Sequence, residues 1–442
     1  MKTKIILCCL ASVLTAASAD DVGQSQNSGQ PQVITLNDGT KLTFLGLTTG
    51  TMQMAPGFET LPTANRLYTP DRPAMAWIKV EQNRDHNWTG ALELLVSDKA
   101  RTACVSLEKS TSSNVRRGVD IQGFILHAFP RWDKEFLARP RLYRGEISSE
   151  EFVITNPAPV PMTNWTPETL PVTKSDGDIE VTLNQLIADA PLEPYRRQRS
   201  ISQDDPQNKC VRIAFDLKQK GQSATNWYPW LVDVSDAVGN HVRTSMQYQD
   251  NELIRQHTRP GYALHYGTND EYKGYYFMPG LWPDEPAWKV RLEFTRQSGF
   301  AADEIVTFTN LSVKLGTQQD HDDQWEWDAS KTNIVPVAEA MVNGVHMKML
   351  PPLLYPPEIM PGEKHLGVSI YADSDLTRQG MRLKVLQATD GQGHEIWSPF
   401  SPAWAGHFEI DLPNPSDVKT LNLKLALHKS RYVEFTVKPT KP

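Results

Sequence analysis

The fold is indicated most clearly by the stretch Trp288-Lys289-Val290-Arg291-Leu292-Glu293-Phe294. Its apolar side chains occupy every second position, and charged side chains occupy the positions between them. Successive side chains of a β-strand point to opposite faces, so this alternation predicts a strand with one face on a core and the other in water. The same period of two recurs at 211–217, 421–427 and 433–437.

Helical periodicity is scarce across the 442 residues, and the 32 prolines would break long helices. Asn37-Asp38-Gly39 stands between two alternating apolar runs and is typical of a tight hairpin turn. Short alternating strands separated by such turns are typical of antiparallel sandwiches. We therefore predict an all-β protein of tandem antiparallel β-sandwich domains, immunoglobulin-like or jelly-roll-like.

Composition suggests where the domains begin and end. A Pro-rich stretch at 158–175 predicts a semi-rigid linker, and an acidic, irregular stretch at 317–333 predicts a second linker. The predicted sandwich domains are therefore 32–157, 176–316 and 334–442, which agrees with the two to three domains expected from the length.

The first residues have the layout of a secretory signal. Lys2 and Lys4 precede an apolar run at 5–14, and Ala17-Ser18-Ala19 offers the small residues that a signal peptidase requires. We predict a signal peptide at 1–19, cleavage near Ala19, and an exported protein, periplasmic or extracellular. Residues 20–31 are rich in Gln, Ser, Asn and Gly and predict a disordered leader. The apolar run is shorter than the roughly 20 residues of a spanning helix, so no membrane span is predicted.

Charge narrows the possible partners. Removing residues 1–19 takes away two lysines and no acidic residue, so 43 basic residues face 52 acidic ones and the net charge becomes −9. Because nucleic-acid affinity depends on neutralising phosphates with Lys and Arg, we expect no nucleic-acid partner. An anionic membrane surface is disfavoured for the same reason.

Two cysteines, Cys104 and Cys210, remain after such processing. An oxidising compartment permits a disulfide between them, which would join the first two predicted domains. The alternative is a pair of separate buried thiols.

Three groups of segments carry a resemblance. They are Ala128-Phe129-Pro130-Arg131, Asn156-Pro157-Ala158-Pro159, and Trp165–Pro171 followed by Asp176–Leu183. Together they resemble predicted exported multi-domain β-proteins of environmental bacteria, over the first two segments of the chain. The resemblance implies the architecture. It brings no activity and no catalytic or binding residues.

Known catalytic motifs do not occur in the sequence. There is no G-x-S-x-G elbow, H-E-x-x-H pair, phosphate-binding loop or dinucleotide fingerprint. Ser106 and Lys109 match S-x-x-K, but they continue a β pattern that points them to opposite sides. We therefore predict no catalytic residue, no cofactor and no metal site.

Aromatic residues concentrate in the middle segment. Flat rings stack on the apolar faces of sugars, so these side chains are candidates for a ligand platform. The alternative is that they fill the core, because Trp and Tyr are good strand formers. The candidates are Trp227, Tyr228, Trp230, Tyr272, Tyr275 and Trp282.

The sequence supports three hypotheses about function. The first is an exported, non-catalytic binding or interaction protein, with a polysaccharide or an envelope protein as partner. The second is a secreted hydrolase of the glycoside type, whose carboxylates meet only in the fold. The third is a structural spacer of the cell envelope.

Overall fold

The computed structural model describes the chain in segments. They are residues 24–25, 31–49, 74–82, 92–101, 104–108, 111–116, 118–126, 128–142, 148–163, 165–191, 209–245, 247–248, 275–277, 281–282, 285–317, 335–355, 365–372, 376, 379–396, 407–411 and 418–441. The predicted signal peptide and almost all of the predicted acidic linker lie outside them.

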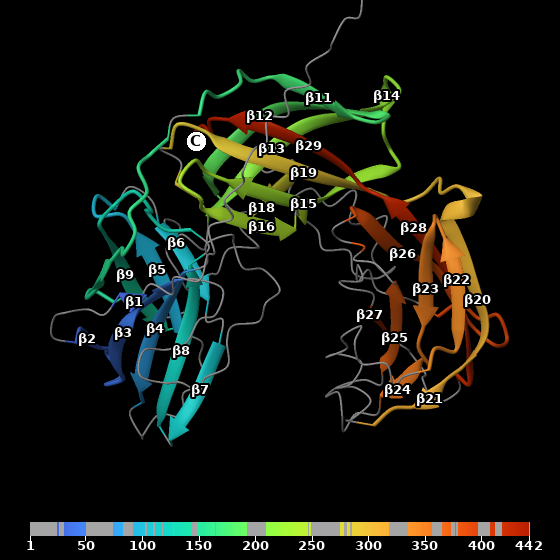
Figure 1. The fold of residues 1–442 in the computed structure, drawn as a ribbon, viewed down its shortest axis with the longest axis horizontal. Coiled ribbons are helices and arrows are strands. Elements are labelled where there is room, and N and C mark those ends of the chain that lie inside the picture. Colours follow the sequence, from blue (N-terminus) through green and yellow to red (C-terminus); the bar gives the residue numbers. More distant parts are fainter. Residues whose placement is uncertain are drawn as a thin grey trace, which may run out of the picture.

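The described residues form three β-sandwiches, each built of two sheets (Figure 1). Their strands are antiparallel except for one short parallel pair, and the described helical structure is the single 3₁₀ turn η4 (Ala302–Glu304). The prediction of an all-β, multi-sandwich protein is therefore confirmed. The sandwiches form an arch, with the second at its top.

The first sandwich contains β1 (Gln24–Ser25), β2 (Val33–Thr35), β3 (Lys41–Thr49), β4 (Ala74–Glu81), β5 (Leu92–Ser97), β6 (Cys104–Glu108), β7 (Thr111–Arg116), β8 (Val119–Leu126), β9 (Glu135–Leu142) and β10 (Phe152–Thr155). One sheet has the order β1-β3-β4-β8-β7, with β2 also on β3, and the other has the order β10-β9-β5-β6.

The second sandwich contains β11 (Val172–Asp176), β12 (Ile179–Pro191), β13 (Lys209–Gln219), β14 (Gln222–Ser223), β15 (Trp227–Ser235), β16 (His241–Ser245), β17 (Gln247–Tyr248), β18 (Tyr275–Phe277), β19 (Trp288–Arg296) and β29 (Arg431–Val437). One sheet is β11-β12-β13-β18-β17, with β14 on β13, and the other is β16-β15-β19-β29.

The third sandwich contains β20 (Ile305–Ser312), β21 (Lys314–Leu315), β22 (Ala338–Val342), β23 (Val345–Met349), β24 (Leu353–Tyr355), β25 (His365–Ala372), β26 (Met381–Asp390), β27 (His407–Asp411) and β28 (Thr420–Lys429). One sheet is β20-β28-β26, and the other is β21-β24-β25-β23-β22, with β27 on β25.

The third sandwich is inserted between two neighbouring strands of the second. The chain leaves the second sandwich after β19, builds the third from β20 to β28, and returns through Ser430 to β29, which pairs with β19. The C-terminal Thr440 then bonds to β12, where its amide donates to the Leu186 carbonyl at 2.9 Å. Two chain crossings therefore connect these two sandwiches.

This pairing differs from the predicted domain limits. The segment 305–312 was assigned to the second domain but pairs with β28, and the segment 431–437 was assigned to the third but pairs with β19. Residues 172–175 of the predicted linker belong to strand β11, and Gln24 and Ser25 of the predicted disordered leader pair with β3. Alternating patterns identify strands and their faces but carry no information about which strand is the partner.

The sheet β16-β15-β19-β29 shows how the sequence positions side chains. Its inward rows are apolar, and Val234, Val290 and Phe435 lie in register with 1%, 0% and 0% of their surface exposed. Each such side chain contributes roughly 1.5–3 kcal/mol on burial. The intervening residues point outward and are mostly polar or charged. The third sandwich covers part of this outer face.

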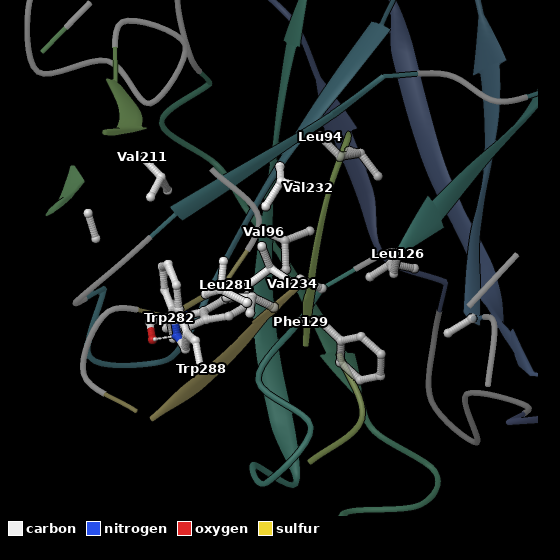
Figure 2. Close-up of a cluster of buried hydrophobic side chains, with 14 of the residues drawn as sticks. Leu94, Val96, Leu126, Phe129, Val211, Val232, Val234, Leu281, Trp282 and Trp288 are labelled. Carbon is white, nitrogen blue, oxygen red and sulfur yellow. Dashed lines mark hydrogen bonds between the residues drawn. The ribbon is translucent and has the colours of Figure 1, made fainter. Parts of the chain in front are cut away.

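The first and second sandwiches share one continuous hydrophobic cluster, whereas the third has its own. Figure 2 shows Phe129 of the first sandwich and Leu281, Trp282 and Trp288 of the second within the shared cluster. The rings of Trp132 and Trp282 meet edge to face across this joint, with their centroids 5.9 Å apart.

Candidate functional site

A pocket of about 370 Å³ lies where the third sandwich meets the outer face of the second. The second sandwich contributes most of its wall from β15, β16, β19 and β29, and the third contributes the turn before β26 and the end of β28. The lining residues are Leu231, Asp233, Arg243, Arg291, Glu293, Gln379, Gly380, Lys429 and Tyr432.

Strand register places these side chains in two rows. Arg243, Asp233 and Arg291 lie opposite one another on β16, β15 and β19. In the next row Glu293 lies between Leu231 on β15 and Tyr432 on β29. Opposite charges at directly facing positions stabilise a sheet by roughly 0.2–1 kcal/mol per pair. The alternation that buries the core face therefore also assembles a charged floor for the pocket.

Gly380 brings the third sandwich close to this floor. Its φ is +68°, and a Cβ at this position would lie 3.1 Å from Cε2 of Tyr432. Its carbonyl accepts a hydrogen bond from the amide of Ser430 at 2.8 Å. A side chain here would meet both backbone strain and the tyrosine ring, so glycine is required for this approach.

Glu293 ties the two sandwiches together beneath the pocket. Its carboxylate is 2% exposed, and Nε of Arg382 on β26 lies 2.6 Å from Oε1. Nη2 of Arg382 donates to Oε2 at 2.7 Å, and the hydroxyl of Ser430 donates to Oε1 at 2.8 Å. Since a buried carboxylate requires such partners, this contact holds the junction in one arrangement.

Tyr432 supports a cation in the pocket wall. The guanidinium carbon of Arg291 lies 4.4 Å from the centre of the Tyr432 ring, within the range of a cation–π contact. Burial, followed by the charge of Glu293, raises the pKa of Tyr432, so its hydroxyl stays protonated. Nη2 of Arg243 lies 3.9 Å from Oε2 of Glu293.

Behind the pocket, two basic groups are buried at the junction. Burial lowers the pKa of Lys384 to about 8, and its Nζ donates to the carbonyl of Gln297 at 3.1 Å. Burial, followed by the charges of Arg296, Lys384 and Arg382, lowers the pKa of His428 to about 3. The neutral imidazole accepts the amide N–H of Arg296 at Nε2, at 3.1 Å.

Acid is therefore expected to weaken the junction between the second and third sandwiches. The unfolded chain takes up a proton on His428 near pH 6.5 and the folded chain does not, so this stabilisation is lost as the pH falls from 6.5 toward 3. The loss from this residue should reach about 1–2 kcal/mol at pH 5, measured by urea unfolding at pH 7 and pH 5.

The matched variants are His428→Gln, which retains an acceptor, and His394→Gln, which changes an exposed histidine. The buried substitution should reduce the acid-dependent loss and the exposed one should leave it unchanged. Equal pH dependence in both variants would contradict the assignment to His428.

Two of the aromatic residues predicted for a ligand platform lie in the core. Trp227 is 7% exposed and Trp282 is 1% exposed, and Nε1 of Trp288 donates to the Trp282 carbonyl at 3.1 Å (Figure 2). Both rings are covered by protein, so they act in packing and do not present a face to a ligand. Tyr275 on β18 stacks on Phe215 of the neighbouring strand β13, with ring centroids 5.0 Å apart. Tyr272 lies outside the described residues.

Tyr228 and Trp230 lie on the outer face of β15, next to Leu231 of the pocket wall. Their ring centroids are 6.1 Å apart and both side chains are half-buried. Burial, followed by the charge of Glu293, raises the pKa of Tyr228, which places this phenol near the Glu293 carboxylate. These two are the predicted residues that the fold brings beside the pocket.

Sequence reasoning missed the charged residues of the pocket. Arg291 and Glu293 were predicted to lie on the solvent face of a strand, and no sequence pattern singled out Arg243, Gln379 or Lys429. A weak signal was present in the alternation itself, because it predicted that Arg291 and Glu293 share one face.

The proposed Cys104–Cys210 disulfide stays a prediction. Cys210 is buried on β13 of the second sandwich, and β6 carries Cys104 in the first. The structure describes the backbone of Cys104 in β6 but not its side chain, so the pairing is not tested.

Among the described residues, no three His, Cys, Asp or Glu side chains gather as a metal site would require. The described part of the chain also contains no helix with the length and apolar character to cross a membrane. Neither a family model, nor a curated protein, nor a solved structure matches this chain. The pocket is therefore interpreted from its own geometry.

Proposed function

We propose that this chain is an exported, non-catalytic binding protein that holds one unit of a polysaccharide in the pocket between its second and third sandwiches. The observation that carries the proposal is the pocket lined by Asp233, Arg243, Arg291, Gln379 and Tyr432. Convergent hydrogen-bonding groups of this kind fix the orientation of a small polar ligand.

The size and surroundings of the pocket suit a small ligand. Its volume of about 370 Å³ lies at the lower end of the range for small-molecule sites. Trp230 and Tyr228 offer aromatic surface beside it, where a neighbouring unit of the same polysaccharide can lie. The ion pair between Glu293 and Arg382 preorganises the two sandwiches, which reduces the entropy that binding would otherwise cost.

Hydrolysis is the second candidate, because the pocket contains the two carboxylates Asp233 and Glu293. A glycosidase needs one carboxyl that donates a proton and another that acts as base or nucleophile. Here both oxygens of Glu293 are held by Arg382 and Ser430, and Asp233 contacts the imidazole of His241. This engagement of both groups favours binding over catalysis.

The proposal is tested with a variant in which a bulky side chain at the edge of the pocket fills it. Gln379 is exposed and lines the pocket, so Gln379→Trp should occupy it without disturbing a core. Calorimetry with neutral and acidic oligosaccharides should show binding by the unmodified protein and at least about tenfold weaker binding by Gln379→Trp, a loss of about 1.4 kcal/mol.

Gln392→Trp is the matched control, because Gln392 is an exposed glutamine in another turn of the third sandwich. It should bind as the unmodified protein does. A folded protein that binds none of the oligosaccharides would overturn the proposal and favour a structural spacer. Release of shortened sugars in the same mixtures would instead favour the hydrolase.

A further inference from the structure

Positive charge exceeds negative charge around the pocket. Arg243, Arg291 and Lys429 line it together with the carboxylates of Asp233 and Glu293. Arg382, behind the wall, already neutralises Glu293 at 2.6 Å. The excess is local, because the chain as a whole carries a net charge of −7. An excess of one sign of charge around a hollow raises the local concentration of ligands of the opposite sign.

The cations are placed where a ligand can reach them. The guanidinium carbon of Arg291 lies 4.4 Å from the centre of the Tyr432 ring, and a guanidinium carries five N–H donors, which a contact through the π-face does not consume. Lys429 is exposed at the end of β28. In the part of the chain that the structure describes, neither Arg291 nor Lys429 has a carboxylate within the 4.0 Å of an ion pair.

The geometry also suits an anion with two oxygens. Arginine donates two parallel N–H groups to a carboxylate or sulfate, and such charge-assisted bonds are roughly twice as strong as neutral ones. Tyr432 restricts the orientation of Arg291, so less side-chain entropy is lost when these bonds form. Lys429 adds a point charge to the lining from the third sandwich, at the end of β28.

We infer that the pocket selects an acidic sugar, in which a carboxylate or sulfate group lies between Arg291 and Lys429. This inference rests on the proposed function and specifies its ligand class. Recognition depends on anionic oxygens carried by a sugar, a chemistry that uronic acids and sulfated sugars share. The remaining lining groups, Arg243, Asp233 and Gln379, are placed to bind hydroxyls.

The test compares oligosaccharides that differ only in charge. A glucuronate-containing oligosaccharide, its glucose-containing counterpart and a sulfated counterpart are titrated into the full chain by calorimetry. At least one acidic oligosaccharide should bind with an affinity ten or more times that of the neutral oligosaccharide. Comparison of the glucuronate-containing and sulfated forms shows whether the pocket prefers a carboxylate or a sulfate. Raising the salt from about 0.1 M to about 1 M shortens the screening length from about 10 Å to about 3 Å and should weaken only acidic ligands.

Arg291→Gln should remove this preference, with a tenfold or greater loss for the acidic ligand and a clearly smaller loss for the neutral one, which lacks the anionic oxygens. Lys289→Gln is the control, since Lys289 stands two positions earlier on the same outer face and does not line the pocket. Arg291→Lys retains the charge without the fork and should lose part of the affinity, which separates charge from geometry.

The outcomes distinguish this inference from the proposed function. Equal binding of neutral and acidic forms, with both blocked by Gln379→Trp, would overturn the acidic selectivity and leave the binding function intact. An acidic preference that survives Arg291→Gln would also overturn it. No binding of any form would overturn both.

Discussion

Arg141→Met is expected to destabilise the first sandwich by about 3–5 kcal/mol, because it leaves a carboxylate buried without its cation. Arg141 on β9 and Glu93 on β5 face each other in register, and both are 0% exposed. Nε and Nη2 of Arg141 lie 2.8 and 2.6 Å from Oε2 of Glu93. Neither water nor a nearby rearrangement can replace these bonds at such a depth.

Urea unfolding of Arg141→Met and of the unmodified protein measures this loss of stability. Lys99→Met is the control, because Lys99 pairs with Glu135 at 2.5 Å while their side chains are 58% and 40% exposed. An exposed pair contributes about 0–1 kcal/mol, so this variant should unfold nearly as the unmodified protein does. Adding Glu93→Leu to Arg141→Met should restore much of the stability. Similar losses in the two single variants would refute the explanation.

Neither Arg141 nor Glu93 could be recognised as buried from the sequence. Glu93 stands in the run Leu92–Ser97, where all six residues are buried, so the period of two disappears. Such a strand is covered on both faces, and a charged residue within it needs a partner that only the folded sheet supplies. Alternation therefore predicts strands best where one face is in water, as in the first half of β19, residues 288–292.

The strand partners differ from the predicted domain limits for a related reason. The runs 421–427 and 433–437 have the same apolar period, yet β28 pairs within the third sandwich and β29 within the second. A single residue, Ser430, separates β28 from β29. The crossing contains no proline or glycine, and its polar run His428-Lys429-Ser430-Arg431 looks like the turn of an ordinary hairpin. Composition finds flexible boundaries and misses those where a strand passes directly from one sheet into another.

The predicted ligand platform and the pocket draw on the same strand, β15, but none of the described platform candidates lines the pocket. Tyr228 and Trp230 point outward while Trp227 is buried, as their alternation requires. The phase then changes at an irregularity in the pairing between Pro229 and Leu231, after which Val232 and Val234 face the core. Such a shift reverses the face of every residue that follows it. Strict alternation counted from the buried Trp227 would therefore place Asp233 on the core face, whereas Asp233 lies on the outer face and lines the pocket.

Glu285→Gln is expected to stabilise the joint between the first and second sandwiches at neutral and alkaline pH. Glu285 is 3% exposed, and burial, followed by the charge and hydrogen bond of Asp236, raises the pKa of Glu285 to about 10. Asp236 accepts hydrogen bonds from the amides of Val238 and Asn240, at 3.0 and 2.8 Å. These bonds stabilise the charged form of Asp236, so the raised pKa of Glu285 places a proton on Glu285.

The consequences extend across the joint. Asn240 donates to Asp236 at 2.6 Å and to the carbonyl of Phe129 in the first sandwich at 2.9 Å, and Nε of Arg131 donates to Asn240 at 2.9 Å. Loss of the proton on Glu285 would place two negative charges, those of Glu285 and Asp236, beneath this contact.

The raised pKa of Glu285 determines how the stability of the joint changes with pH. The stabilisation is complete below about pH 4.5, where both states hold the proton, and is lost as the pH rises toward 10. Glutamine keeps the shape and a hydrogen-bond donor without the ionisation. The variant should exceed the unmodified protein by about 2–3 kcal/mol at pH 7, and the difference should grow by at most about 1.4 kcal/mol per pH unit.

Urea unfolding between pH 5 and pH 9 measures this difference, with the exposed Glu395→Gln as the control, which should show none. A Glu285→Gln protein that is less stable at pH 9 than the unmodified protein would contradict a protonated Glu285. The result also separates the two joints, because His428 weakens the second with acid while Glu285 weakens the first with alkali. If His428→Gln reduces the loss of stability in acid and Glu285→Gln reduces the loss in alkali, the acid loss belongs to the junction of the second and third sandwiches. The alkaline loss then belongs to the joint of the first and second.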